Sequence, residues 1–120
     1  MKVGKGNVIV EKTFEFALNI IQYVEILERN RRYVIARQLL RSATSIGANV
    51  REAQNAESRA DFIHKMKVAA KETEESEYWL ELCQYSPGYP DPGELTGQCF
   101  VVKKIISAII GSTRKMTKQK

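Results

Sequence analysis

Hydrophobic residues recur along the chain at intervals of three and four, the spacing that places them on one side of an α-helix. This pattern predicts four helices, over residues 10–28, 33–54, 59–85 and 92–113. No run of strict apolar–polar alternation is long enough to predict a strand. The breaks between the helices are short, which favours antiparallel neighbours. The sequence therefore predicts an all-α fold, an up-and-down antiparallel four-helix bundle in a single domain.

The third predicted helix has the clearest core stripe, because its small and apolar residues alternate spacings of four and three. That stripe consists of Phe62, Met66, Ala69, Thr73, Ser76, Leu80 and Cys83. In the first helix the predicted stripe is broader, and Phe16 and Tyr23 widen it at its edges. Its central residues are Phe14, Ala17, Ile20, Ile21, Val24 and Leu27. Helices one and four both carry more apolar surface than one core requires.

Polar residues mark where the helices begin. Ser58, with Asp61 three residues later, predicts the N-terminus of the third helix. Asp91 followed by Pro92 predicts the start of the fourth, because proline suits the first helical position. The basic tail, residues 114–120, is expected to fray.

Composition narrows the class of protein. The chain has 120 residues, 43% hydrophobic and 28% charged, which fits one globular domain. Its net charge of +5 favours anionic partners such as nucleic acid without requiring one. The N-terminus lacks the apolar segment of a secretory signal, and no stretch approaches a membrane span, so we expect a cytoplasmic protein without a membrane partner. Cys83 and Cys99 are expected to be reduced and buried.

Arginines gather on one side of the second predicted helix, away from its core stripe. Arg37, Arg41 and Arg51 lie within an arc of roughly 80°. Guanidinium groups suit phosphates because their planar forks donate paired hydrogen bonds. With the flanking arginines included, the predicted nucleic-acid-binding surface, for RNA or DNA, is Arg29, Arg31, Arg32, Arg37, Arg41, Arg51 and Arg59. In the alternative interpretation these arginines form a solvated face or pair with acidic residues of this or a neighbouring subunit. The third helix supplies candidate partners: Glu72, Glu74, Glu75, Glu77 and Glu81.

A second apolar stripe on the third helix, made of Val68, Trp79 and Leu82, is displaced from the core stripe. Surplus apolar surface of this kind indicates subunit contacts, so we predict an oligomer interface there. The alternative is that Trp79 is partly covered within one bundle, since tryptophan often touches both core and solvent.

Candidate catalytic chemistry is sparse. His64 is the only histidine, and Asp61 precedes it with the carboxylate-x-x-His spacing of di-iron bundles. Such sites need two of these motifs and further inward-pointing glutamates, which the sequence does not supply. Phosphate-binding loops, dinucleotide fingerprints and nucleophile elbows are also missing from the sequence. We therefore expect no enzyme, no metal and no cofactor.

Three segments resemble a family of four-helix bundles named after proteins encoded in 23S rRNA intervening sequences, also described as S23 ribosomal protein-like. They are QLLRSATSIGANVREA (38–53), SRADF (58–62) and ETEESEYWLELC (72–83). Residues that match the family pattern are Leu39, Arg41, Ala43, Ser45, Ile46, Ala48, Asn49, Glu52, Phe62, Glu75, Glu77 and Leu80. The chain departs from the proline, small and glycine residues common in the family at Gly47, Arg51 and Ala53.

The resemblance carries implications for assembly and partners. The family is similar in fold to the accessory variability protein of diversity-generating retroelements, and such proteins form homopentamers with basic surfaces implicated in nucleic-acid or reverse-transcriptase binding. We therefore expect a non-enzymatic oligomer that binds nucleic acid through the second helix. Two alternatives stay open: a protein-interaction scaffold or accessory subunit, for example of a reverse transcriptase, and an rRNA-intervening-sequence protein of unknown role.

Overall fold

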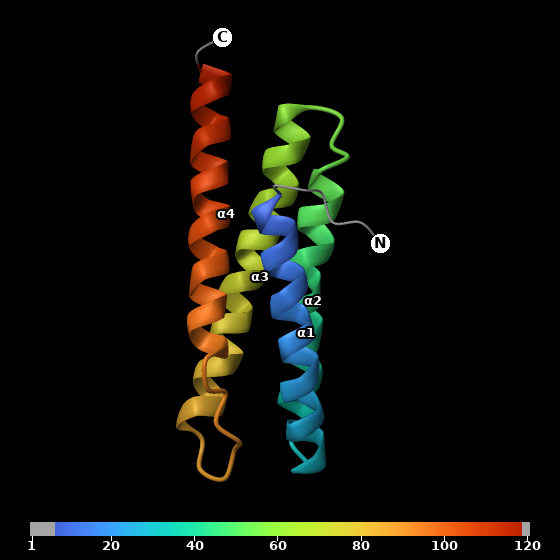
Figure 1. Ribbon diagram of the computed structural model, residues 1–120, viewed down its shortest axis with the longest axis vertical. Coiled ribbons are helices and arrows are strands. Elements are labelled where there is room, and N and C mark those ends of the chain that lie inside the picture. Colours follow the sequence, from blue (N-terminus) through green and yellow to red (C-terminus); the bar gives the residue numbers. More distant parts are fainter. Residues whose placement is uncertain (1–6, 119–120) are drawn as a thin grey trace.

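Four helices joined by short loops make up the computed structural model, which describes residues 7–118, with side chains to Met116. The helices are α1 (Val8–Arg29), α2 (Tyr33–Ala53), α3 (Arg59–Tyr85) and α4 (Leu95–Lys118). They run alternately up and down (Figure 1), and residues 7–118 contain no strand. The predicted all-α antiparallel bundle is confirmed.

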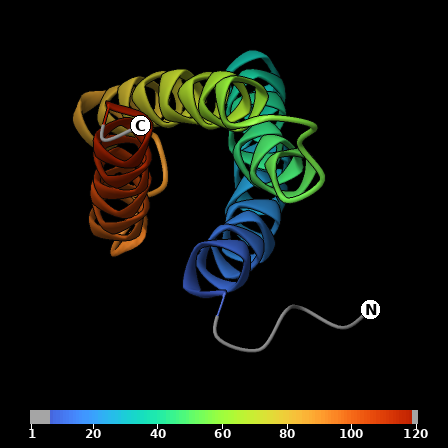
Figure 2. The same cartoon turned by 90° about the horizontal axis from the view of Figure 1, so that it is seen from above.

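The helices are packed in the order of the chain. α1 packs against α2, α2 against α3, and α3 against α4, and the smallest of the helix contacts joins α1 to α4. Seen end-on, α1 and α4 form the two ends of a bent row (Figure 2). The helices therefore form a bent row in chain order. The first and last helices, α1 and α4, touch along a seam that is smaller than the other helix contacts.

The core stripe predicted for α3 is confirmed. All of its residues are buried except Phe62, which is half-buried and packs against the core. This stripe is the side of α3 that lies between α2 and α4. Ser76 within it is satisfied by Ser42 of α2, whose hydroxyl oxygen lies 2.8 Å away.

The stripe predicted for α1 is wrong in its centre. Phe16 and Tyr23, placed at its edges, are 1% and 5% exposed, whereas Phe14 and Ile21, placed at its centre, are 45% and 39% exposed. The reason is that α1 contacts α2 on one side and α4 on another, so its buried face lies between them. The buried residues of α1 are Ile9, Val10, Thr13, Phe16, Ile20, Tyr23, Val24 and Leu27.

Helix ends follow the local polar residues. Ser58 caps α3 as predicted, because its side chain accepts a hydrogen bond of 3.0 Å from the N–H of Asp61. α4 begins at Leu95, three residues later than predicted. The Asp91 carboxylate accepts a hydrogen bond from the N–H of Gly93 at 3.0 Å, and Gly93 has a φ of +60°, which a continuing helix does not allow. At its other end α4 is helical to Lys118, so most of the expected tail belongs to the helix.

Over Leu95–Met116, α4 is long and apolar enough to cross a membrane by length and composition alone. The expectation that no stretch approaches such a span is therefore wrong for this helix. In the bundle one side of α4 packs against α3 and α1. The buried residues on that side are Leu95, Cys99, Val102, Ile106 and Ile110.

Candidate nucleic-acid interface

The seven arginines predicted to form one surface are spread along the bundle. Arg29, Arg31, Arg32 and Arg37 lie at the end where α1 passes into α2. A rise of about 1.5 Å per residue separates Arg37 from Arg51 by about 21 Å along α2. Arg59 begins α3, at the same far end as Arg51, and is half-buried. The structure therefore brings together only Arg29, Arg31, Arg32 and Arg37, at the α1–α2 end of the bundle.

Arg41 pairs with carboxylates of α3, as the alternative interpretation supposed. Its guanidinium lies 3.4 Å from a carboxylate oxygen of Glu72 and also forms an ion pair with Glu75. The indole N–H of Trp79 donates to the Glu75 carboxylate at 3.1 Å. These hydrogen bonds, first from Trp79 and then from Arg41, lower the pKa of the Glu75 carboxyl. Arg41 therefore links α2 to α3 and has less freedom to bind a phosphate.

Two further arginines stack on aromatic rings. The Arg32 guanidinium lies 4.6 Å from the centre of the Tyr89 ring and donates a hydrogen bond of 3.3 Å to the carbonyl oxygen of Gly88. It thereby joins the α1–α2 loop to the α3–α4 loop. The Arg51 guanidinium lies 5.2 Å from the centre of the Phe14 ring. Both side chains have a structural role within the bundle.

The remaining arginines, Arg29, Arg31 and Arg37, are exposed and form no ion pair within residues 7–116. Arg31 also has a φ of +62°, in the left-handed region. Its N–H bonds to the carbonyl oxygen of Glu28 at 2.9 Å, and the next N–H bonds to that of Leu27 at 2.8 Å. This is a Schellman motif at the end of α1, where glycine is favoured. An arginine at this position costs about 1 kcal/mol or more of backbone strain.

Other exposed basic residues were missed by the sequence analysis. Lys67 and Arg114 line a groove between α3 and α4, and Lys71, Lys104 and Lys115 are exposed nearby on the same two helices. The sequence does indicate this basic region, because the segment that forms α4 contains no aspartate or glutamate.

The predicted oligomer interface is largely covered within one chain. Val68, Trp79 and Leu82 are all half-buried, and Trp79 packs against the core. Larger apolar side chains are exposed on the outer faces of α1 and α4. The sequence placed two of them, Phe14 and Ile21, in the core and did not indicate the others, Leu18, Phe100 and Val101.

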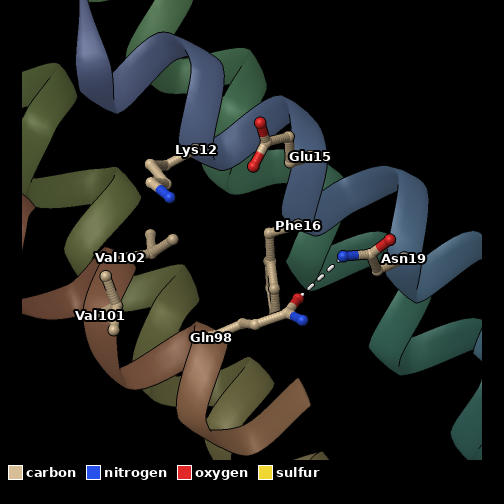
Figure 3. Close-up of a pocket in the computed structure, with 7 residues that line it drawn as sticks. All are labelled: Lys12, Glu15, Phe16, Asn19, Gln98, Val101 and Val102. Carbon is tan, nitrogen blue, oxygen red and sulfur yellow. Dashed lines mark hydrogen bonds between the residues drawn. The ribbon is translucent and has the colours of Figure 1, made fainter. Parts of the chain in front are cut away.

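A shallow groove follows the seam between α1 and α4 (Figure 3). Its lining residues are Lys12, Glu15, Phe16, Asn19, Gln98, Val101 and Val102. The Asn19 side-chain amide donates to the Gln98 carbonyl oxygen at 3.0 Å and so joins the two helices across the seam. The groove thus combines an apolar floor with a single inter-helix hydrogen bond.

Nucleophilic and metal-binding groups are not assembled in the described part of the chain. Cys83 and Cys99 are buried free thiols, as predicted, and burial raises the pKa of both, that of Cys99 to about 12. Protonated buried thiols are poor nucleophiles. His64 is exposed, and no three His, Cys, Asp or Glu residues among those described are placed to hold a metal ion.

Comparison with known proteins places this architecture in a family. The family model of the 23S rRNA-intervening sequence protein matches residues 5–107. A crystal structure of a protein with unknown function from the S23 ribosomal protein family of Bacteroides thetaiotaomicron is 39% identical, with a TM-score of 0.80. The similarity covers 85% of this chain and 97% of that one. None of the curated proteins matches this chain. The matched segment includes α1, α2 and α3 in full, and the chain belongs to the 23S rRNA-intervening sequence protein family.

Proposed function

We propose that this chain is a non-enzymatic, self-associating bundle that binds the phosphate backbone of nucleic acid at the α1–α2 end. The observation that carries the proposal is the group of three exposed guanidiniums there, Arg29, Arg31 and Arg37, without carboxylate partners in the described residues. The net charge of +5 supports attraction to an anionic polymer. Compared with the surface expected from sequence, this surface is smaller, because Arg32, Arg41 and Arg51 already contact other side chains.

The strained backbone of Arg31 adds to this argument. Residues held in sparsely populated backbone regions concentrate at functional sites. The Schellman motif fixes the Arg31 backbone while its side chain stays exposed. Exposed glutamates, Glu25 and Glu28, lie on the same last turns of α1. Their charge repels phosphates, so binding should be of moderate strength. Because the contacts are to the backbone, binding should be sequence-independent and sensitive to salt.

A triple substitution tests the proposal. Replacing Arg29, Arg31 and Arg37 together by alanine should raise the Kd for a short single-stranded RNA about tenfold or more at low salt. The slope of log Kd against log salt should become shallower by roughly two, because each phosphate contact contributes about 0.7. Fluorescence anisotropy at several salt concentrations measures both quantities.

The matched control removes the same charge elsewhere. Lys67, Lys71 and Lys115 are exposed on α3 and α4, and their combined replacement by alanine should leave the salt slope nearly unchanged. Equal losses in both triple variants would show attraction by net charge alone and overturn the assignment to the α1–α2 end. Failure of the unmodified protein to bind RNA or DNA at low salt would favour a protein scaffold or accessory subunit.

Arg31→Gly separates the backbone from the side chain. Glycine tolerates the left-handed conformation, so the free energy of unfolding should rise by about 1 kcal/mol. The same variant should bind RNA a few-fold more weakly, because a guanidinium is lost. Urea unfolding and anisotropy measure the two effects. A less stable Arg31→Gly variant would contradict the strain argument, and unchanged binding would remove Arg31 from the interface.

A further inference from the structure

An apolar stripe runs along the outer side of α1. Phe14, Leu18 and Ile21 follow one another at helical spacing and are 45%, 46% and 39% exposed. A groove between α1 and α2 adjoins the stripe, and its α2 side is formed by Thr44, Gly47, Ala48 and Arg51, whose guanidinium lies 5.2 Å from the centre of the Phe14 ring. A Cβ atom at Gly47 would lie 3.5 Å from the Thr13 side chain, an ordinary contact, so the core does not require glycine there. We call Phe14, Leu18 and Ile21 the α1 face.

Carboxylates border the α1 face. The exposed glutamates of α1 form no ion pair with any described residue, and they are Glu11, Glu15, Glu25 and Glu28. An exposed apolar stripe with an acidic border suits a partner surface that is apolar and basic.

The outer side of α4 has that composition. Phe100 and Val101 are 47% and 46% exposed, and the Lys104 ammonium lies 5.3 Å from the centre of the Phe100 ring. Gly97, one turn before Phe100, and Ala108, two turns after it, are exposed as well, and a Cβ atom at Gly97 would meet no other atom within 4 Å. Small residues at these positions let another helix approach closely. We call these five residues the α4 face, which no acidic residue of α4 interrupts.

The two faces are positioned to meet between copies. α1 and α4 lie at opposite ends of the row of helices (Figure 2) and run antiparallel (Figure 1). The hydrogen bond from Asn19 to Gln98 shows which residues of the two helices lie at one height. In a second copy related by rotation about an axis along the bundle, heights are preserved.

That register matches the chemistry of the faces. Counting in opposite directions from the Asn19–Gln98 pair, Leu18 is level with Phe100 to within about one residue, or 1.5 Å. By the same count Lys104 is level with Phe14 and within about 3 Å in height of both Glu11 and Glu15. Apolar side chains therefore face apolar side chains, and the lysine faces two carboxylates that have no other partner among the described residues.

We propose that the α1 face of one copy packs against the α4 face of the next. This inference rests on the self-association in the proposed function and specifies its interface. The contact is head-to-tail, so each copy keeps one free α1 face and one free α4 face until a ring closes. The interface accordingly lies at the ends of the row of helices, away from the half-buried Val68, Trp79 and Leu82.

Complementary blocking variants test the proposal without nucleic acid. Leu18→Asp blocks only the α1 face, and Phe100→Asp blocks only the α4 face. Each variant alone should be monomeric by light-scattering mass, while the unmodified protein forms an assembly larger than a dimer. An equimolar mixture should form a one-to-one heterodimer, because one intact face of each kind remains. Native mass spectrometry of an isotope-labelled mixture confirms that the dimer contains both variants.

The control is Val34→Asp, which introduces the same charge at an apolar residue of α2 that is 70% exposed, and it should keep the unmodified mass. Circular dichroism verifies that all variants fold, as expected for substitutions at exposed positions. An unmodified protein that assembles while either blocked variant retains its full mass overturns the pairing of faces and leaves self-association standing. A mixture that remains monomeric also overturns the pairing, and a monomeric unmodified protein overturns self-association itself.

Discussion

Phe16→Ala should lower the free energy of unfolding by about 3–5 kcal/mol, the usual cost of removing a buried phenylalanine ring. Phe16 is 1% exposed and lies at the floor of the α1–α4 seam, beside Gln98 and Val102 (Figure 3). Because α1 and α4 have few other contacts, the cavity left by the ring would weaken the least supported junction of the bundle. Urea unfolding followed by circular dichroism gives the value.

Phe14→Ala provides the matched control. Phe14 is two residues away on the same helix but 45% exposed, so its truncation should cost less than about 1 kcal/mol. Both substitutions belong in the Leu18→Asp background, where self-association does not add to stability. Similar losses for the two variants would place Phe14 in the core and contradict the orientation of α1.

Alkaline pH should lower the free energy of unfolding, because the Cys99 thiol is buried. Burial raises the pKa of the Cys99 thiol to about 12, from an ordinary value of 9.0. A raised pKa means that the folded protein holds this proton more tightly than the unfolded chain does. The resulting stability is complete below pH 9 and is lost as pH rises toward 12. At pH 11 the loss from Cys99 alone should be on the order of 2–3 kcal/mol.

Two other buried groups act in the same direction. Burial raises the pKa of the Tyr23 hydroxyl, which donates a hydrogen bond of 2.6 Å to the carbonyl oxygen of Pro90, and burial also raises the pKa of Cys83. Urea unfolding at pH 7, 9 and 11 should therefore show a steep fall above pH 9. Cys99→Ala should flatten this fall while costing some stability at pH 7. An equally steep fall in Cys99→Ala would exclude the thiol as its main source.

The orientation of α3 could be predicted from sequence, and that of α1 could not, for one physical reason. On α3 the buried stripe keeps its alternating spacings of four and three and is covered by α2 and α4, while the displaced stripe of Val68, Trp79 and Leu82 is only half-buried. On α1, Phe14 and Ile21 are as apolar as the true core residues, and a helical wheel gives equal weight to exposed and buried phenylalanine. The core also includes Thr13, whose hydroxyl bonds to the Ile9 carbonyl at 2.8 Å and so needs no partner from another helix.

The arginines of α2 show a similar limit to what the sequence can predict. Arg37 and Arg41 are one turn apart on the same side of α2, and the sequence offered glutamates of α3 as partners for either. Only the rotation of α2 against α3 determines that Arg41 reaches Glu72 and Glu75 while Arg37 forms no ion pair among the described residues. Helical periodicity specifies which residues share a face of one helix. It does not specify how two helices are turned relative to each other.

The order of the helices in the row has a consequence for how the chain reaches its structure. Each helix packs chiefly against the helix that precedes or follows it, so most core contacts join segments that are close in sequence. Low contact order of this kind favours fast folding. During synthesis α1 and α2 can pair before α4 has left the ribosome, and every later helix finds its main partner already in place. Among the helix pairs that pack together, the pair most distant in sequence, α1 with α4, also has the smallest contact, so folding can finish with a short closing step.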